Sequence, residues 1–149
     1  MTEKPAEPLI KPTKLSHGTM ECHDLKESRR FFEEFLGLEC VRHGPRTMLA
    51  RKGGGWAVVC VNAGDKVHPQ HYFNHWGIDV QSREEVDEAH ANAVRCKEKY
   101  GIKKIADPLE NHGAYSFYFE DLNSSWWEVQ YLLENSFEDL FQKGDAFPM

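Results

Sequence analysis

Residues 115–131 alternate between large apolar and polar side chains in two stretches that are separated by a polar turn. Successive side chains of a strand point to opposite faces, so this alternation predicts two neighbouring strands joined at Asp121–Ser125. The apolar face of the first strand is formed by Tyr115, Phe117 and Phe119. Glu128 lies in the middle of the second strand, on the same face as Trp126 and Gln130. A carboxylate among aromatic side chains inside a sheet needs a partner, a proton or a metal ion.

The chain before these strands divides into a strand, a helix and three further strands. Asp24 with Glu27 three residues later is a capping-box pattern that predicts the start of the helix, and Gly37 predicts its end. The expected elements are a strand at Leu15–Cys22, a helix at 24–36, and strands at Glu39–His43, Arg46–Arg51 and Trp56–Asn62. Gly53–Gly55 joins two strands and opens no helix, which favours a turn over a phosphate-binding loop.

Residues 74–132 repeat this order. Ser82 with Glu85 predicts the start of the second helix, and Gly101 predicts its end. The expected strands are Asn74–Val80, Ile102–Ala106, Ala114–Glu120 and Trp126–Leu132. The sequence therefore predicts an α+β fold of two βαβββ modules in tandem, at 14–62 and 74–132, within one domain at 14–132.

Two flanking segments lie outside this repeat. Residues 1–13 carry three prolines among charged residues, which predicts a flexible arm. Residues 133–149 form a tail in which Glu134–Gln142 has a helical pattern of apolar side chains, suited to cover a sheet edge or a partner subunit. A polar linker, Ala63–Phe73, connects the two modules.

The composition and charge of the chain limit the kinds of molecule that it could bind and indicate where it is found in the cell. The net charge of −6 and the lack of a basic stripe argue against nucleic acid. No apolar run is long enough to span a membrane, and the start of the chain does not resemble a signal peptide. Four scattered cysteines are typical of reduced thiols, so a cytoplasmic location is expected.

Three residues suggest a metal site. His17 and His75 occupy equivalent places at the start of the two modules, and each is followed four residues later by an acid, Glu21 or Asp79. A pseudo-twofold relation between the modules would bring the two imidazoles together with Glu128. Two imidazoles and one carboxylate on one face of a divalent metal leave the opposite positions open. A lone strand histidine is more often a hydrogen-bonded structural residue, and the two acids either orient the histidines or face water.

Over residues 14–132 the chain resembles the vicinal oxygen chelate superfamily, which contains glyoxalases, bleomycin-resistance proteins and extradiol dioxygenases. The resemblance implies that the eight strands of the two modules form a curled, mixed sheet around a metal. It places the metal ligands at His17, His75 and Glu128, implies chelation of adjacent substrate oxygens by the metal, and implies a homodimer.

Among the branches of this superfamily, the chain most resembles the extradiol ring-cleaving dioxygenases. Glyoxalase-type sites add a carboxylate in the strand that corresponds to Trp56–Asn62, which has none. The extradiol signature matches His112, Tyr118 and Glu128. By resemblance, Tyr118 would hydrogen-bond the substrate and His112 would be an acid/base residue. The alternatives are sheet packing for Tyr118 and an exposed loop position for His112.

The resulting functional hypothesis is an Fe(II)-dependent dioxygenase, with Mn(II) or Zn(II) as alternative metals, that cleaves a catecholic ring with O₂. Trp126 shares the face of Glu128 and would wall the substrate pocket. Another metalloenzyme of the superfamily, a lyase, an epimerase or a thiol transferase, remains an alternative, although a transferase would need basic residues just after Glu128, where this chain has none until Lys143. A non-catalytic protein that binds an aromatic ligand, as bleomycin-resistance proteins do, is the alternative without metal ligands.

Overall fold

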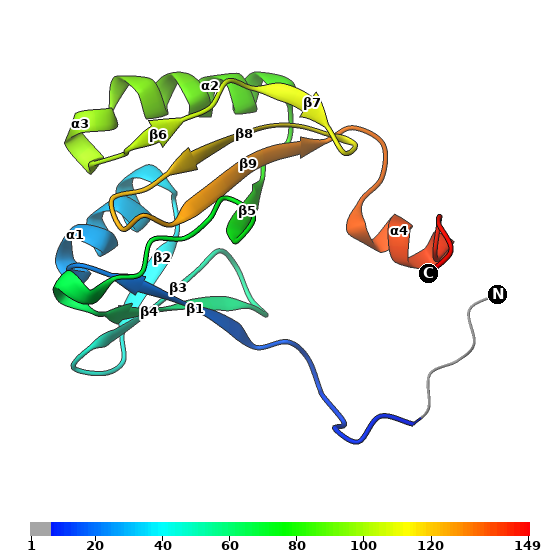
Figure 1. The fold of residues 1–149 in the computed structure, drawn as a ribbon, viewed down its shortest axis with the longest axis horizontal. Helices are drawn as coiled ribbons and strands as arrows, with labels where there is room; N and C mark the ends of the chain where they lie inside the picture. The colour runs from blue at the N-terminus through cyan, green and yellow to red at the C-terminus, as the bar shows by residue number, and fades with distance from the viewer. Residues whose placement is uncertain (1–6) are drawn as a thin grey trace.

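A computed structural model describes residues 7–149 and places them in two β-sheets, each with helices packed against it (Figure 1). The first sheet has the strand order β1-β4-β3-β2. Its strands are β1 (His17–Cys22), β2 (Glu39–Arg42), β3 (Thr47–Arg51) and β4 (Ala57–Asn62). The first and last strands of this module, β1 and β4, are parallel neighbours, and the other pairs are antiparallel.

The second sheet is built in the same way. Its order is β5-β9-β8-β6, and β7 pairs with β8 beside this path. Its strands are β5 (His75–Asp79), β6 (Lys104–Ile105), β7 (Leu109–Asn111), β8 (Ala114–Glu120) and β9 (Trp126–Leu132). Here too the first strand runs parallel to the last, β5 beside β9. The expected α+β fold with two βαβββ modules is therefore confirmed.

Two details of the sheets differ from the sequence expectation. Each module pairs its own first and last strands, so within the described residues the strands form separate sheets of four and five instead of one sheet of eight. The ninth strand, β7, arises because the segment after β6 continues in the same direction along β8 toward the start of that strand, where Leu109 pairs with Ser116. Both β1 and β5 are left as edge strands of their sheets.

The helices begin and end where the capping residues predict, but both are interrupted. Asp24 accepts a hydrogen bond from the Glu27 amide and starts α1 (Leu25–Arg30), which continues as a π-helical segment η1 (Phe31–Phe35). The second helix is divided into α2 (Arg83–Arg95) and α3 (Lys97–Tyr100). Gly37 and Gly101 end the two helical regions with φ of 70° and 68°, in the left-handed region that favours glycine.

An aromatic core joins the two modules. Phe31 and Phe35 of η1 pack edge-on against Phe119 of β8, with ring centroids 6.3 and 5.9 Å apart. Phe32 packs against Trp127 of β9 at 6.0 Å. Phe31, Phe32 and Phe119 are completely buried. Because these rings occupy one face of β8 and β9, the opposite face of the same strands remains for polar residues.

The turn between β8 and β9 is fixed by a buried carboxylate. Asp121 accepts hydrogen bonds from the amides of Asn123 and Ser125 and from the indole of Trp127. Burial raises the pKa of Asp121 to about 6, although these donors favour the charged form. This turn sets the antiparallel register that places Tyr118 directly opposite Glu128.

The segment that precedes β1, from residue 7, and the segment that follows β9 leave the body on the same side (Figure 1). The tail forms α4 (Phe137–Lys143), close to the expected helix, and Ser136 caps it with a capping box. Of the predicted arm, residues 1–6 lie outside the described residues, and residues 7–13 contain no helix or strand. No helix within residues 7–149 has the length and apolar character to cross a membrane.

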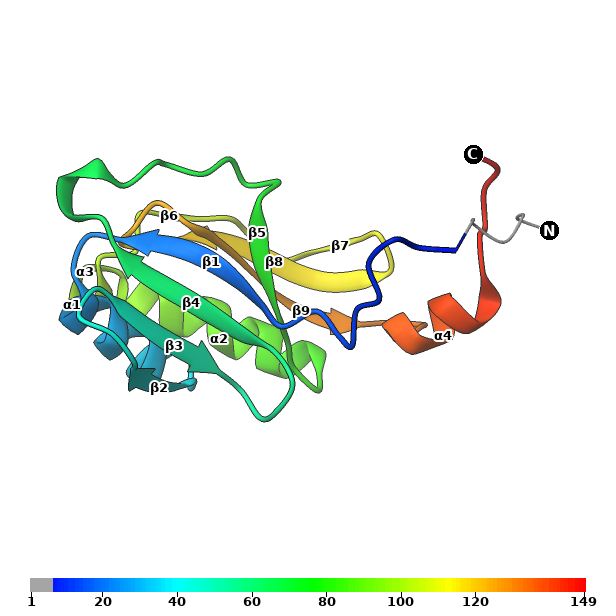
Figure 2. The ribbon, with the colours of Figure 1, turned by 90° about the horizontal axis from the view of Figure 1, so that it is seen from below.

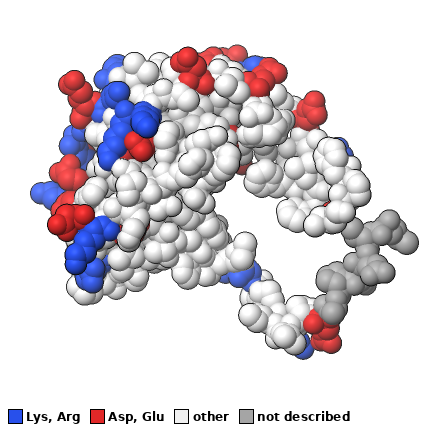
Figure 3. All heavy atoms as spheres, in the orientation of Figure 1, with Lys and Arg blue, Asp and Glu red and all other residues white. Residues whose placement is uncertain are grey.

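The surface shown in Figure 3 has lysine and arginine side chains interspersed with acidic ones on the side of the helices. The side that faces α4 is mostly uncharged in this view. All four cysteines are unpaired thiols, as the sequence predicts.

Candidate metal and substrate site

Glu128 is the centre of the polar face of β8 and β9. Only 5% of it is exposed, and the Ser116 hydroxyl donates a hydrogen bond of 2.7 Å to its Oε2. Ser116 and Tyr118 project from β8 on the face of Glu128, because residues two apart share a face. The sheet thus holds a carboxylate in a fixed orientation away from bulk water.

His75 lies beside this carboxylate at the start of β5. Its Nε2 is 3.4 Å from Oε1 of Glu128, and its Nδ1 is 2.7 Å from the main-chain oxygen of Tyr72. A carbonyl oxygen only accepts hydrogen bonds, so Nδ1 carries a proton and Nε2 is directed toward the carboxylate. The space between Nε2 and the carboxylate oxygen suits a proton or a metal cation, because both atoms can offer a lone pair.

His112 and Tyr118 complete the cluster. His112 lies in the turn between β7 and β8 with a positive φ of 42°, and its Nε2 is 3.3 Å from Oε2 of Glu128. The same nitrogen is 3.4 Å from the Tyr118 hydroxyl. Burial and hydrogen bonding to Glu128 raise the pKa of Tyr118 to about 12, so the phenol keeps its proton at neutral pH.

His17 does not join this cluster within one chain. It is the first residue of β1, it is exposed, and its Nδ1 contacts the hydroxyl of Ser16 at 2.6 Å. Across residues 7–149, no three or more His, Cys, Asp or Glu side chains come together so that they could hold a metal ion. The pair formed by His75 and Glu128 suits a divalent metal in its donor atoms, but one chain supplies two of the three predicted ligands.

The acids that follow the two histidines have other partners. Glu21 accepts hydrogen bonds from the amide and from Nδ1 of His68, and these contacts lower its pKa. Asp79 accepts a hydrogen bond of 2.8 Å from the side-chain amide of Gln130. Glu21 therefore links the linker to β1 by hydrogen bonds, and Asp79 links β5 to β9. The hydrogen bond that orients His75 is the one to the main-chain oxygen of Tyr72.

A cavity of about 410 Å³ opens beside Glu128. Its polar lining includes His75, Asp79, His112, Glu128 and Gln130, and its apolar lining includes Phe137 and Leu140 of α4. Gly77 also lines the cavity and lies opposite Glu128 in the register of β5 and β9. A Cβ atom at Gly77 would meet nothing within 4 Å, so the missing side chain leaves this space open.

Trp126 is close to the site but is covered by the linker. Its indole donates a hydrogen bond of 3.1 Å to the main-chain oxygen of Gln70, and its ring lies 6.2 Å from that of Tyr72. The Tyr72 ring is also 6.3 Å from that of Tyr118. The predicted role of Trp126 as a pocket wall stays a prediction.

Sequence reasoning missed three residues of the site: Ser116, Gly77 and Tyr72. Strand alternation in the sequence could have identified two of them, because Ser116 shares the polar face of Tyr118, and Gly77 shares the face of His75. No sequence feature indicated a role for Tyr72 beyond its position three residues before His75, because the linker has no periodic pattern.

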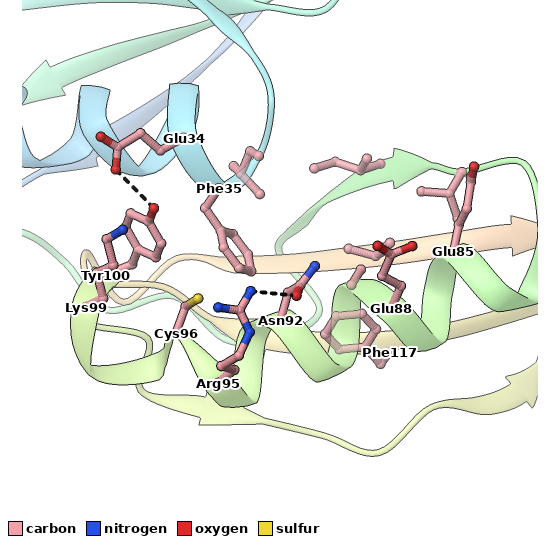
Figure 4. Close-up of a pocket in the computed structure, with 15 residues that line it drawn as sticks. Glu34, Phe35, Glu85, Glu88, Asn92, Arg95, Cys96, Lys99, Tyr100 and Phe117 are labelled. Carbon is pink, nitrogen blue, oxygen red and sulfur yellow. Dashed lines mark hydrogen bonds between the residues drawn. The ribbon is translucent and has the colours of Figure 1, made fainter.

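A second cavity, of about 400 Å³, lies between η1 and the helices α2 and α3 (Figure 4). The Tyr100 hydroxyl donates to Glu34 at 3.0 Å across one end of it, and Arg95 donates to Asn92 at 2.9 Å on α2. None of the predicted site residues lines it. This cavity is part of the junction between the two modules.

Comparisons with known proteins agree with this architecture. A search of curated proteins gives no match. A glyoxalase/bleomycin resistance protein/dioxygenase from Nocardioides is 20% identical, with a TM-score of 0.65 and coverage of 87% of this chain and 89% of that one. A possible glyoxalase from Bacillus cereus is 26% identical, with a TM-score of 0.62 and coverage of 79% and 98%. The fosfomycin resistance protein FosX from Listeria monocytogenes, in a complex with Mn(II) and sulfate, is 18% identical, with a TM-score of 0.64 and coverage of 89% and 98%.

At these identities the solved structures establish the fold, while the family follows from a match over most of the chain. The model of the family described as Glyoxalase/Bleomycin resistance protein/Dioxygenase superfamily matches residues 14–129. That range includes β1 to β8 and reaches Val129, just beyond Glu128. The chain therefore belongs to the glyoxalase/bleomycin resistance protein/dioxygenase superfamily.

Proposed function

We propose that this chain is a divalent-metal-dependent enzyme for a small substrate with two adjacent oxygen atoms, and that it works by acid–base catalysis as a lyase or epimerase does. The observation that carries this proposal is the buried Glu128 carboxylate, whose Oε1 lies 3.4 Å from Nε2 of His75. Two of the fold neighbours are in line with a non-redox reaction, because one is named as a possible glyoxalase and the other as a fosfomycin resistance protein in a complex with Mn(II).

His75 and Glu128 would hold the metal. When bound, the metal would act as a Lewis acid that polarises a substrate oxygen. Ser116 keeps one carboxylate oxygen oriented through its hydrogen bond, and the Tyr72 carbonyl keeps His75 in the ligating tautomer. Both contacts exist within one chain, so the half-site is organised before any ligand arrives.

His112 and Tyr118 would move protons beside the substrate. The His112 Nε2 and the Tyr118 hydroxyl are 3.4 Å apart, and both open toward the carboxylate of Glu128. An imidazole can both accept and donate a proton, so His112 suits an acid/base role. Tyr118, whose pKa is raised to about 12, would donate a hydrogen bond to a substrate oxygen.

The third ligand in this proposal is His17 of a second copy of the chain. β1 and β5 are both edge strands, so the start of β1 is accessible to another copy. A twofold-symmetric dimer would form two equivalent sites, each with His75 and Glu128 from one copy and His17 from the other.

Extradiol ring cleavage with Fe(II) and O₂ is the second candidate. It is favoured by the contact of His112 with Tyr118 and by the aromatic rings of Tyr118 and Tyr72 near the carboxylate. In this alternative a catecholic substrate would occupy the same cavity, with Tyr118 as hydrogen-bond donor.

The test begins with metal binding. Isothermal titration with Mn(II), Zn(II) and, without oxygen, Fe(II) should show binding by the wild type and a loss of more than about 10-fold in affinity for Glu128→Gln. Glu120→Gln is a matched control, because Glu120 lies on β8 at the far end of the same face. Equal affinity for wild type and Glu128→Gln would exclude the proposed site.

The metal-loaded protein would then be assayed for the two reaction classes. One set of substrates tests non-redox chemistry: the hemithioacetal of methylglyoxal with glutathione, and fosfomycin with water. The other set is a panel of catechols with O₂, followed by oxygen uptake. Turnover of the first set alone supports the main proposal, and turnover of catechols alone supports the second candidate.

A further inference from the structure

The C-terminal half of the linker between the modules is held in place by hydrogen bonds. After the short helix η2 (Gly64–Lys66) it runs along the open side of both sheets to β5 (Figure 2). His68 binds Glu21 at 2.8 Å, and the amide of Gln70 donates to the main-chain oxygen of Ser124 at 2.9 Å. The Asn74 amide donates to the main-chain oxygen of His71 at 2.8 Å. These contacts place the intervening residue, Tyr72, at a defined position.

The main chain of Tyr72 controls the predicted metal ligand. Its oxygen accepts a hydrogen bond from Nδ1 of His75 at 2.7 Å, and Nε2 of the same ring is directed to Glu128. Metal-bound histidines require this kind of outer partner to fix their tautomer and ring orientation. The loop therefore holds the His75 ring in the orientation that directs Nε2 to Glu128.

The side chain of Tyr72 extends an aromatic surface from His75. Tyr118 packs edge-on against His75 with ring centroids 4.9 Å apart, and Tyr72 packs edge-on against both Tyr118 and Trp126. Tyr72 remains 45% exposed, so the residue is partly accessible to a ligand. Phe73 is 74% exposed and packs edge-on against Tyr72 and His71, with no ring contact to Tyr118 or Trp126 among the described residues.

We propose that Tyr72 is a positioning and specificity residue of the site formed by His75 and Glu128. Its main-chain oxygen fixes the tautomer of His75, and its ring is the wall on which a flat, unsaturated part of the substrate packs. The inference rests on the proposed function, since it assigns the substrate class of the same site. That class is a molecule with a conjugated or aromatic group next to its metal-binding oxygens.

The ring is tested with two probes that both offer adjacent oxygens: 4-nitrocatechol, which is aromatic, and glycolate, which is not. Binding to the Mn(II)-loaded protein is measured by absorbance for 4-nitrocatechol and by calorimetry for glycolate. Tyr72→Leu should weaken 4-nitrocatechol by about 5- to 10-fold, the effect of one aromatic pair, and leave glycolate unchanged. Tyr72→Phe keeps the ring and should bind like the wild type, as should the control Phe73→Leu.

Three results would overturn the role of the ring. The first is failure of the wild type to bind 4-nitrocatechol. The second is an equal loss in Tyr72→Leu and Phe73→Leu, which would indicate a general effect of the linker. The third is an equal loss for both probes in Tyr72→Leu, which would indicate damage to the metal half-site.

The main-chain role has its own measurement. In protein labelled with ¹⁵N-histidine, long-range ¹H–¹⁵N spectra at about pH 8 should show the Nδ1–H tautomer for His75, assigned by its loss in His75→Gln. The same tautomer should persist in Tyr72→Leu, because the carbonyl remains. An Nε2–H tautomer in the wild type would contradict the positioning role.

Failure of this inference can be told apart from failure of the proposed function. If metal does not bind through Glu128, the proposed metalloenzyme is excluded. Tyr72-dependent binding of 4-nitrocatechol to the metal-free protein, followed by tryptophan fluorescence, would still support the aromatic wall. If metal binds and Tyr72→Leu behaves like the wild type toward both probes, the inference about Tyr72 alone is wrong.

Discussion

Gly77 of β5 lies directly opposite Glu128 of β9, so the carboxylate faces a position without a side chain. Both residues line the same cavity, and a Cβ atom at Gly77 would enter open space. Glycine is unfavourable in a strand interior, where it often marks the close approach of a ligand. We interpret Gly77 as the residue that keeps the space beside Glu128 free.

Gly77→Val should therefore weaken metal binding without lowering the stability of the fold. Valine fits a strand better than glycine, so the midpoint of thermal unfolding should stay the same or rise. Its branched side chain would fill the space beside Glu128 and lower Mn(II) affinity by more than about 10-fold, the upper part of the range for disturbed metal sites. Gly77→Ala should give a smaller loss. Wild-type affinity in Gly77→Val would show that the metal does not occupy this space.

Ser116 should matter for metal binding more than for folding. Its hydroxyl orients Oε2 of Glu128 at 2.7 Å, and Ser116→Ala leaves that oxygen without this donor. We expect a loss of about 10-fold in metal affinity by titration calorimetry. Ser28→Ala is the matched control, because Ser28 is equally buried but accepts its hydrogen bond from Asn123, away from the site. A similar loss in both variants would argue for a general packing effect.

Gly18 should be intolerant of any side chain. A Cβ atom there would overlap the ring of Trp76, which is itself held against Trp56 with centroids 5.4 Å apart. Gly18→Ala should lower the free energy of unfolding in urea by about 1–3 kcal/mol, the usual cost of overpacking. Gly54→Ala is the control, since a Cβ atom there meets nothing within 4 Å. Equal stability of the two variants would mean that the Trp76 ring moves aside freely.

Because of Asp121, the free energy of unfolding should vary with pH in the acidic range. Its pKa is raised by burial to about 6 from 3.8, so the folded state binds the proton more tightly than the unfolded state. Protonated Asp121 therefore adds up to about 3 kcal/mol to the free energy of unfolding. This contribution is fully present below about pH 4 and is lost as the pH rises through 6.

Asp121→Asn should remove this slope from urea unfolding curves measured between about pH 4 and 7. It should also destabilise the protein by about 1–3 kcal/mol, because the new amide donor would face the Trp127 indole donor. An unchanged pH slope in the variant would assign the titration to another group.

The sequence predicted the parts of the site that depend on local periodicity. Glu128 and Tyr118 were placed on one face by strand alternation, and the turn at Asp121 brought them into register. The caps at Asp24 and Ser82 located the helices because their hydrogen bonds are local.

The parts that were not predicted depend on contacts distant in sequence. Tyr72 reaches the site because Gln70 binds Ser124 and Trp126, more than fifty residues away. The separate sheets follow from the parallel pairing of β1 with β4 and of β5 with β9, which strand patterns do not encode. For the same reason, the repeat gave His17 and His75 equivalent positions without showing that their strands, β1 and β5, lie in separate sheets.

A mixing experiment tests whether His17 acts between copies. His17→Ala and Glu128→Gln should each lose tight Mn(II) binding as separate proteins. In a mixed dimer the Glu128→Gln copy would supply His17 to the intact His75 and Glu128 of the other copy, which restores one of its two sites. Random mixing by co-refolding should then recover about a quarter of the wild-type metal stoichiometry. If the three ligands belonged to one chain, every chain in the mixture would lack one of them, and no tight site would return.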